Sequence, residues 1–411
     1  MELYNIFEQC SGVTTDSRKV GAGELFFALH GANFNGNLYA IKALEAGAAY
    51  AVVDEQPETL PEEYKERVIV VEDTLLALQA LAAEHRRRLQ IPILGIVGSN
   101  GKTTTKELTS RVLAEKFNIY ATRGNLNNHI GVPLTLLAMD SSVEFGVVEM
   151  GASAQGEIAA LCAICQPNYG IITNIGNAHL EGFGGHEGII KGKGELYDYL
   201  AANGGRAFVA QEDEIVTLIA AVRIDMAVEP YSYSLSEGYK SNLSGDYNSR
   251  NIAAAVAIGR YFDIAPERIA SAIESYIPEN NRSQEQMTNH GNRLIIDCYN
   301  ANPSSMEVAL ANIANKEGAK LLILGDMLEL GQWSESEHNR ILKLATEIDS
   351  VDIILVGEHF RKAAHSLAID AICCKDNSEA ADYLTQSHIS NTTILLKGSR
   401  GIALEKLIDC L

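Results

Sequence analysis

The sequence predicts an α/β protein built on parallel sheets, and two observations support this. First, short apolar runs alternate with helical stretches from residue 91 onward, and segments buried on both faces with helices between them are typical of a parallel sheet covered on both sides. Second, 411 residues exceed what one hydrophobic core usually organises, so two or three domains are expected. The strand-like runs are "ILGIVG", "FGVVEMG", "YGIITNIG" and "AFVA", then "RLIIDCYN", "KLLILGDM", "DIILVG" and "TILLKGS".

The segment before residue 90 reads as a small α/β unit of its own. It contains a strand-like "ELFFAL", a helix and strand in "YAIKALEAGAAYAVVDE", and a helical "LLALQALAAEHRRRL". Arg86 to Arg88 suit the last turn of that helix, where cations meet the negative end of the macrodipole, so we interpret them as a helix cap. A polar joint, "YIPENNRSQEQ", marks a second boundary. We therefore predict domains at 1–89, 90–280 and 281–411.

Charge and composition exclude several classes of protein. Lys and Arg total 33 against 53 acids, a net charge of −20, which disfavours nucleic acid and acidic membranes as partners. The start, "MELYNIFEQC", has no basic signal-like region, and no apolar run approaches the roughly 20 residues that span a bilayer. We expect a cytoplasmic protein without membrane insertion. Cys162 and Cys165 form a C-x-x-C in an apolar helix-like run with no second pair, so we interpret them as structural.

A shortened phosphate-binding loop is the strongest motif. The usual form is G-x-x-x-x-G-K-[ST], but Ile96 stands where its first glycine would be. The strand-like run before the loop and the helical "KTTTKELTSRVLAEKF" after it give the context that a P-loop requires. Glycines turn backbone N–H groups toward an anion, the lysine neutralises phosphate, and the Thr103 hydroxyl can bind magnesium. The predicted ATP-binding segment comprises Gly98, Ser99, Asn100, Gly101, Lys102, Thr103 and Thr104.

Polar, acidic or glycine-containing clusters follow the other strands. Ligands of open α/β sheets bind at the carboxyl ends of the strands, so these clusters predict one cleft between domains. Glu149 would hold magnesium or water there, because a buried acid is costly unless it meets a cation. His179 alone could equally be structural, but it falls on the same edge as the loop. The clusters are 98–103, 149–151, 174–179, 297–302, 325–329 and 397–400.

Several motifs together resemble the Mur ligases of bacterial cell-wall synthesis, most narrowly those that add D-alanyl-D-alanine to UDP-N-acetylmuramoyl-tripeptide. In order they are "GSNGKTTTKE", "GNLNNHIGVPLTLL", "EMGASAQGEI", "NAHLEGFG", "KGKGEL", "IDCYNANPSSM", "LGDMLELG" and "LLKGSRG", and the likeness begins near "TTDSRK". That family shares the shortened loop. The resemblance implies an N-terminal UDP-sugar domain, a central ATPase domain and a Rossmann-like C-terminal domain.

The resemblance also implies cofactors and catalytic roles. ATP and two magnesium ions are expected, with Thr103, Glu149, His179 and Lys193 at the metal site and Lys193 carbamylated by carbon dioxide. Lys102, His179 and Lys193 are the implied catalytic residues. The tripeptide carboxylate would take the γ-phosphoryl group of ATP, and the dipeptide amine would attack the resulting acyl phosphate. The remaining ATP contacts implied are Asn251 in "GDYNSRNIAAA", where Tyr247 replaces a usual histidine, and Arg282 and Asp297. Either of the last two could equally form a plain interdomain ion pair.

Substrate contacts follow from the same resemblance. Asp326 could equally be a helix N-cap, and the asparagines of "GNLNNHIGVP" could be plain turn residues. The UDP-sugar contacts implied are Ser17, Arg18, His30 and Gly31; further polar contacts are Asn125, Asn127 and Asn128; the dipeptide contacts are Asn300, Asn302, Asp326, Ser399 and Arg400.

Three other functions remain open on the sequence alone. A related ligase could add a diamino acid or glutamate, although the Asp-x-Pro-Arg type of signature of the diaminopimelate-adding relatives is not present. A P-loop NTPase switch or motor would hydrolyse ATP without an amine. A nucleotide-sugar binding protein without catalysis is disfavoured by the intact Lys102, Glu149, His179 and Lys193. For the ligase we expect a monomer.

Overall fold

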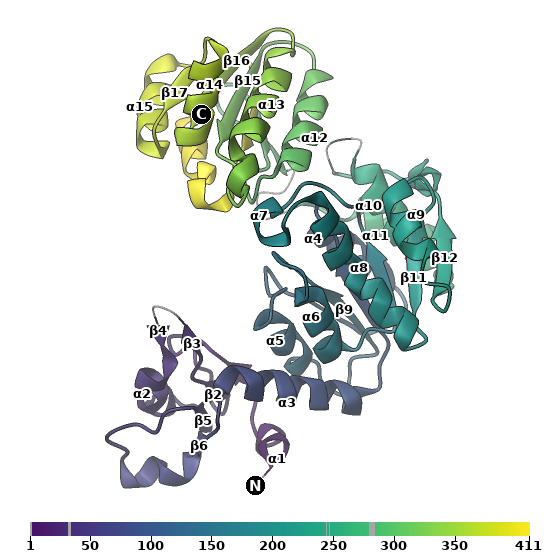
Figure 1. The fold of residues 1–411 in the computed structure, drawn as a ribbon, viewed down its shortest axis with the longest axis vertical. Helices are drawn as coiled ribbons and strands as arrows, with labels where there is room; N and C mark the ends of the chain where they lie inside the picture. Colours follow the sequence, from purple (N-terminus) through teal and green to yellow (C-terminus); the bar gives the residue numbers. More distant parts are fainter. Residues whose placement is uncertain (1, 32–33, 244, 246, 279–283) are drawn as a thin grey trace.

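Three separate sheets follow one another along the chain, with a two-stranded ribbon beside the first. The computed structural model describes residues 2–31, 34–243, 245, 247–278 and 284–411. Figure 1 shows the N-terminal part at one end of the long axis, the central part in the middle and the C-terminal part at the other end. Each sheet is mainly or wholly parallel, so the α/β class predicted from the alternating runs is confirmed.

The N-terminal sheet has the strand order β1-β2-β5-β6, with every pairing parallel. One face packs on α2 and the other on α1 and α3, because alternate residues of β2 point to opposite sides. The strands are β1 (Val13–Thr14), β2 (Leu25–Phe27), β5 (Tyr50–Val53) and β6 (Val68–Val70), with the ribbon β3 (His30–Gly31) and β4 (Phe34–Asn35). The α-helices are α1 (Leu3–Phe7), α2 (Ala40–Glu45) and α3 (Thr74–Leu89).

The long helix α3 joins the first sheet to the central part. Arg86 is buried and donates hydrogen bonds to the backbone carbonyls of Cys165 and Gln166, at the end of α6. His85 bonds the Met139 carbonyl through Nε2 at 2.7 Å. Arg86, Arg87 and Arg88 lie in the last turn of α3, as predicted. The guanidinium of Arg86, however, bonds the carbonyl end of a different helix, which the sequence does not reveal.

The central sheet has the order β12-β11-β10-β7-β9-β8 and is parallel throughout. Helices α4, α10 and α11 cover one face, and α5, α6, α8 and α9 cover the other. The strands are β7 (Ile93–Val97), β8 (Ile119–Ala121), β9 (Phe145–Glu149), β10 (Tyr169–Ile172), β11 (Arg206–Ala210) and β12 (Ala227–Tyr231). The α-helices are α4 (Lys102–Ala114), α5 (Gly131–Leu137), α6 (Glu157–Cys165), α7 (Leu180–Phe183), α8 (His186–Ala202), α9 (Glu214–Ala221), α10 (Asn248–Tyr261) and α11 (Pro266–Glu274).

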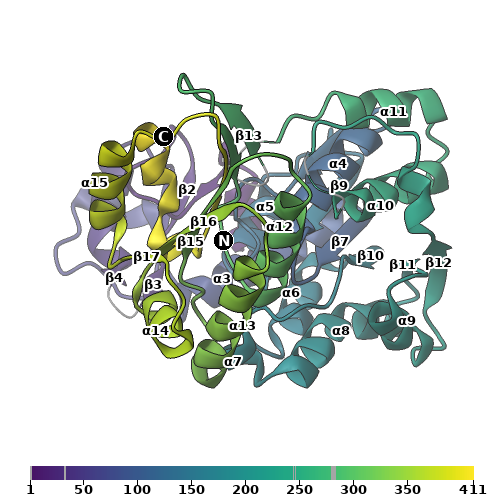
Figure 2. The same ribbon diagram turned by 90° about the horizontal axis from the view of Figure 1, so that it is seen from above.

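The C-terminal sheet has the order β13-β14-β18-β15-β16-β17, in which only the β13–β14 pair is antiparallel. Helices α12, α13 and α14 cover one face, and α15 covers the other (Figures 1 and 2). The strands are β13 (Gln284–Met287), β14 (Arg293–Ile296), β15 (Lys320–Gly325), β16 (Val351–Val356), β17 (Ile372–Cys374) and β18 (Thr393–Lys397). The α-helices are α12 (Pro303–Ala314), α13 (Ser334–Thr346), α14 (Glu358–Leu367) and α15 (Asn377–Ser387).

Two sequence-based expectations about the surface and the cysteines can be compared with the structure. In the part of the chain that the structure describes, no helix combines the length and apolar character needed to cross a bilayer. Cys162 and Cys165 lie buried in α6 as free thiols. Burial raises the pKa of Cys165 to about 12 and that of Cys162 well above its usual range. Both thiols therefore stay protonated, as their structural interpretation requires.

Candidate active site

A cavity of about 650 Å³ lies where the central sheet faces the C-terminal one. Each of the six polar clusters predicted from strand ends contributes at least one wall residue, so the expected single cleft is confirmed. The central part supplies the glycine-rich loop, Glu149, Gly151 and the 174–179 segment. The C-terminal part supplies the opposite wall, which consists of Asp297, Tyr299, Asn300, Asn302, Ser304, Ser305, Val308, Glu329 and Lys397.

The shortened loop depends on two glycines for steric reasons. Gly98 has a φ of +148°, and a Cβ there would lie 2.0 Å from the hydroxyl oxygen of Thr173. Gly101 has a φ of +77°, and its Cβ would lie 2.5 Å from the side-chain oxygen of Asn251. These φ values and close approaches suit only glycine. The loop therefore packs tightly against β10 and α10 without the glycine that the usual motif has at its start.

Some backbone N–H groups of this loop hold it in place, and others face the position where an anion would bind. The backbone N–H groups of Ser99 and Asn100 donate to the backbone and side-chain oxygens of Asn174, at 3.1 and 3.0 Å, and so fasten the loop to the end of β10. The N–H groups of Gly101, Lys102 and Thr103 begin α4, where a helix has no partners of its own for them. The first turn of α4 therefore presents the loop's anion-binding amides.

Glu149 ends β9 beside the loop and is 1% exposed. Its carboxylate accepts hydrogen bonds from the Thr103 hydroxyl at 2.9 Å and from the Asn127 amide at 2.8 Å. Among the residues that the structure describes, no lysine or arginine forms an ion pair with it. A buried carboxylate with neutral partners at a cavity wall is an arrangement that a bound cation stabilises.

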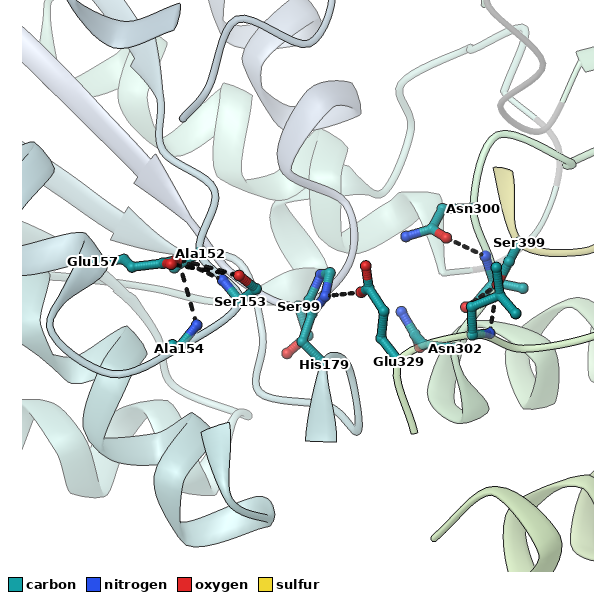
Figure 3. A network of polar contacts seen from close by, with 12 residues as sticks. Ser99, Ala152, Ser153, Ala154, Glu157, His179, Asn300, Asn302, Glu329 and Ser399 are labelled. Atoms are coloured by element: carbon teal, nitrogen blue, oxygen red, sulfur yellow. Dashed lines mark hydrogen bonds and ion pairs between the residues drawn. The ribbon is translucent and has the colours of Figure 1, made fainter. Parts of the chain in front are cut away.

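His179 lies on the central wall of the cavity, and its Nδ1 contacts the carboxylate of Glu329 on the C-terminal wall (Figure 3). Burial lowers the pKa of His179, and Lys102 and Lys193 lower it further, while Glu329 opposes them. Both residues adopt left-handed backbone conformations, with φ of 54° and 62°. This contact links two segments that the sequence analysis had placed on one edge, but Glu329 itself was not singled out.

Lys193 is buried behind the cavity wall. Its amine donates to the Ala152 carbonyl at 3.1 Å and lies 4.8 Å from the centre of the Phe183 ring. Burial, and next the charge of Lys102, lowers the pKa of Lys193 to about 7, although Glu157 and Glu195 act in the opposite direction. A large fraction of this amine is therefore neutral at physiological pH, which is the nucleophilic form.

Direct hydrogen bonds connect the two walls. The Asn302 amide Nδ2 donates to the Asn100 side-chain oxygen at 2.8 Å. The Asn177 backbone N–H donates to the Ser304 hydroxyl at 2.8 Å. Asn302 also begins α12 in a capping box with Ser305, which fixes its orientation. The C-terminal wall is thus attached to the phosphate-binding loop itself.

All three parts of the chain match known sequence families. Residues 9–86 match the Mur ligase family catalytic domain, residues 96–254 the Mur ligase middle domain, and residues 281–400 the Mur ligase glutamate ligase domain. The UDP-N-acetylmuramoyl-tripeptide–D-alanyl-D-alanine ligase of Bacillus subtilis is 34% identical over 97% of this chain and 92% of its own length. The chain belongs to the Mur ligase family.

Solved Mur ligase structures have the same fold. A crystal structure of MurF from Acinetobacter baumannii matches with a TM-score of 0.87 and 29% identity, over 99% of this chain and 97% of the other. A structure of the MurF ligase of Thermotoga maritima in complex with ADP has a TM-score of 0.83 and 23% identity, over 98% and 97% of the two chains. The three-domain α/β architecture that the resemblance implied is therefore confirmed.

Most of the ATP and metal contacts that the Mur ligase resemblance implied lie at the cavity, but not all of them line it. Lys193 and Gly98 lie behind the wall, and Arg282 falls outside the described residues. Asp297 forms an ion pair with the buried Lys397 at 2.6 Å, a partner that the sequence analysis did not identify. The implied ATP and metal residues that line the cavity are Ser99, Asn100, Gly101, Lys102, Thr103, Thr104, Glu149, His179, Asn251 and Asp297.

Three residues expected in the Mur ligase dipeptide pocket do not line the cavity. The buried Asp326 accepts the backbone N–H groups of His359 and Phe360, both at 2.9 Å, so it caps the first turn of α14. Ser399 donates to the Ala301 carbonyl and accepts the N–H of Leu328. Arg400 pairs with Glu405 at 3.1 Å. We correct Asp326 and Ser399 to structural residues, because neighbouring backbone already occupies their polar atoms, whereas Asn300 and Asn302 do line the cavity.

The expected UDP-sugar contacts of the Mur ligase fold lie in the N-terminal part, and none of them lines the cavity. Arg18 pairs with Asp16 at 2.8 Å, and His30 lies 3.6 Å from the Asp54 carboxylate. Ser17 is partly exposed, and Gly31 ends the short strand β3. Asn127 and Asn128 line the cavity, while Asn125 is exposed outside it.

The donor set fits magnesium better than zinc. No group of three or more His, Cys, Asp or Glu side chains that could enclose a metal occurs in the described part of the chain. Magnesium is usually held by one or two carboxylates together with substrate phosphates, so such a cage is not required. Glu149 and Thr103 would supply the oxygen ligands, beside the amides where phosphate would bind.

Proposed function

We propose that this chain is an ATP-dependent ligase that joins D-alanyl-D-alanine to UDP-N-acetylmuramoyl-tripeptide in peptidoglycan precursor synthesis. One observation carries this: Lys102, Thr103 and Glu149 share a cavity with Asn300 and Asn302 of the facing wall. A phosphoryl donor on one wall and an amine on the other can then react at one point. The close relatives of full length that bear this activity in their names support the same substrates.

The reaction has two steps in which charge and atoms balance. A carboxylate oxygen of the tripeptide attacks the γ-phosphorus of ATP, and ADP leaves with the electrons of the broken bond. The dipeptide amine then attacks the acyl carbon, phosphate leaves, and the amine loses one proton. Two anions meet in the first step, so positive charge at the loop contributes most to the rate. Magnesium, when bound, would neutralise the phosphate oxygens and draw charge from the bond being broken.

The loop lysine and the helix α4 position the phosphates. In the structure the Lys102 amine donates to the carbonyls of Gly98 and Ser99, at 2.7 and 3.3 Å. We expect it to turn toward the β- and γ-phosphates when ATP binds, since a phosphate is a stronger partner for an ammonium than a carbonyl. Asn251 stabilises the first turn of α4, because its side-chain oxygen accepts a hydrogen bond of 3.0 Å from the Thr105 hydroxyl. From the resemblance to Mur ligases, we expect adenine next to Asn251. Arg282 is proposed to reach ATP from the C-terminal domain.

A carbamate on Lys193 completes the proposed metal site. The neutral amine would attack carbon dioxide, forming an N–C bond and releasing a proton, so that a side chain that could carry positive charge becomes an anion that attracts a metal. Its test is the carbamate carbon signal of enzyme equilibrated with ¹³C-bicarbonate, which Lys193→Ala should lack. Short carboxylic acids should restore part of the activity of that variant. A wild-type spectrum without the signal would contradict the modification.

The remaining assignments are also proposals. Domains 1–89, 90–280 and 281–411 would bind the UDP-sugar, ATP and the dipeptide respectively. Two magnesium ions, a monomeric state and a cytoplasmic location fit this role, because the precursors of such a ligase are made inside the cell. The UDP-sugar contacts proposed are Ser17, Arg18, His30 and Gly31.

A phosphate-release assay over a matrix of amino acids and dipeptides tests the function. With ATP and Mg²⁺ present, release should require both UDP-N-acetylmuramoyl-tripeptide and D-alanyl-D-alanine. Rapid release with either one missing would indicate an NTPase. Release that a diamino acid or glutamate supports better than the dipeptide would assign the chain to another branch of the family.

A further inference from the structure

A second lysine lies one turn beyond Lys102 on α4 and has no role in the reaction described above. Lys106 is only 1% exposed. Its amine donates to the Thr122 carbonyl at 2.7 Å and pairs with Glu107 at 2.7 Å. Burying an ammonium is costly, and here the Thr122 carbonyl and the Glu107 carboxylate replace the lost water.

The partner of Lys106 is the residue that holds the backbone of Glu149. Thr122 directly follows β8, and its hydroxyl accepts the backbone N–H of Glu149 at 3.0 Å. Its own N–H donates to the Val147 carbonyl at 3.0 Å. Thr122 therefore fixes the last residues of β9, where the Glu149 carboxylate enters the cavity wall.

The chain that starts at Thr122 also holds the Glu149 side chain. Five residues on, the Asn127 amide donates to Glu149 Oε1 at 2.8 Å, and the Asn127 carbonyl accepts the N–H of Gly151 at 2.7 Å. A Cβ on Gly151 would lie 3.0 Å from the Asn127 side chain, so the two segments are in close contact. Residues 122–127 thus contact Glu149 at both ends, and Lys106 anchors their start.

Helix α4 consequently reaches Glu149 by two routes. Thr103 contacts the carboxylate directly at 2.9 Å, and Lys106 acts through Thr122 and the 122–127 segment. We propose that Lys106 is a positioning residue that couples the phosphate-binding helix to the Glu149 carboxylate and thereby sets how strongly a divalent cation tightens nucleotide binding. This inference rests on the proposed ATP and magnesium site.

Binding of ADP, measured by calorimetry with Mg²⁺ and with EDTA, tests the coupling without turnover. In Lys106→Met, which keeps the length and loses the charge, ADP affinity in EDTA should stay near that of the wild type. The tightening by Mg²⁺ should fall by about tenfold or more, as is typical when an outer contact to a metal ligand is removed. A variant that keeps the full Mg²⁺ effect, or that loses ADP affinity equally in both conditions, would overturn the proposal.

Lys320 provides a matched control. It is 6% exposed, and within the described part of the chain its amine bonds the carbonyls of Gly318 and Asp349 at 3.4 and 3.2 Å. It begins β15, whereas the cavity lies beyond the carboxyl end of that strand. Lys320→Met should lower stability and leave the Mg²⁺ effect unchanged. Equal loss of the Mg²⁺ effect in both variants would mean that any buried lysine matters in this way, and it would refute the coupling.

A second pair of variants keeps the test valid if Lys106→Met does not fold. Thr122→Val removes the hydroxyl that accepts the Glu149 N–H, and Thr122→Ser retains it. The valine variant should lose the Mg²⁺ effect and the serine variant should keep it; an unchanged effect in the valine variant contradicts the proposal. A wild-type chain whose ADP affinity does not respond to Mg²⁺ would overturn the metal site and the coupling together, whereas the variant outcomes bear on the coupling alone.

Discussion

The Asn302 amide donates a hydrogen bond of 2.8 Å to the side-chain oxygen of Asn100, which joins residues 202 positions apart. Asn100 belongs to the phosphate-binding loop, and Asn302 begins helix α12 of the facing domain. The bond attaches the C-terminal wall of the cavity, where we propose that the dipeptide binds, to the loop. Its strength should therefore influence how often the two walls are aligned.

Asn302→Asp separates this bond from the capping role of the same residue. The aspartate can still accept the N–H of Ser305 and cap α12, but it places a carboxylate against the Asn100 oxygen. We expect a small change in the unfolding midpoint, a raised KM for the dipeptide, and a larger radius of gyration by X-ray scattering. Asn302→Ala should also lose the cap, at a cost of about 1 kcal/mol. An aspartate variant with unchanged scattering and KM would contradict this.

The two glycine positions Gly98 and Gly124 differ in a way that stability measurements can detect. A Cβ on Gly98 would meet Thr173 at 2.0 Å, whereas Gly124, with a φ of +56°, has nothing within 4 Å. Gly124→Ala should cost about 1 kcal/mol from its backbone conformation alone. Gly98→Ala should lower the free energy of unfolding by more than the about 1–3 kcal/mol expected from backbone strain alone, and it should abolish ADP binding. Urea unfolding and calorimetry check both, and equal effects would refute the steric argument.

Asp326→Asn tests the correction made to the predicted dipeptide pocket. Each carboxylate oxygen of Asp326 accepts one backbone N–H of α14, whereas the asparagine amide has a single acceptor oxygen. The free energy of unfolding should therefore fall by about 1 kcal/mol. The KM for D-alanyl-D-alanine should stay near the wild-type value. Asn300→Ala, at a residue that lines the cavity, should show the reverse pattern. A raised KM at unchanged stability for Asp326→Asn would restore its place in the pocket.

The buried amine of Lys193 should make stability depend on pH. Its pKa is about 7 in the folded state against an ordinary value of 10.5, so between these pH values the folded chain has released a proton that the unfolded chain still holds. The free energy of unfolding should therefore rise with pH in this range, by up to about 1.4 kcal/mol per pH unit from this residue. Urea midpoints in buffers free of carbon dioxide should show a smaller rise for Lys193→Met. Identical slopes for the two chains would show that Lys193 is not buried in this way.

The features that depend on local pattern were predictable from the sequence. The runs "ILGIVG" and "FGVVEM" form β7 and β9, and the polar residues after them meet at the cavity, because parallel strands align their carboxyl ends at one edge. The shortened loop was recognised from its own glycines and lysine. For such features, the residues that determine the structure are neighbours in the chain.

The features that depend on distant partners were not predictable in this way. Asp326 caps a helix whose first residues lie more than 30 positions later, so the sequence could not decide between a cap and a ligand. Likewise, the loop motif identifies Lys102 in "GKTTTKE", but no local pattern shows that Lys106 is buried against Thr122. Glu329 was within a quoted motif, yet its contact with His179 joins two domains and leaves no local signal.

The bonds of His85 and Arg86 to Met139, Cys165 and Gln166 have a consequence for substrate length. They attach α3, and with it the first sheet, to the central part of the chain. If the N-terminal part binds the nucleotide end of the precursor, as proposed, the precursor must extend from there to the cavity to present its free carboxylate to ATP. We therefore expect that a precursor whose peptide is one amino acid shorter would not bring its carboxylate within reach of the γ-phosphoryl group of ATP.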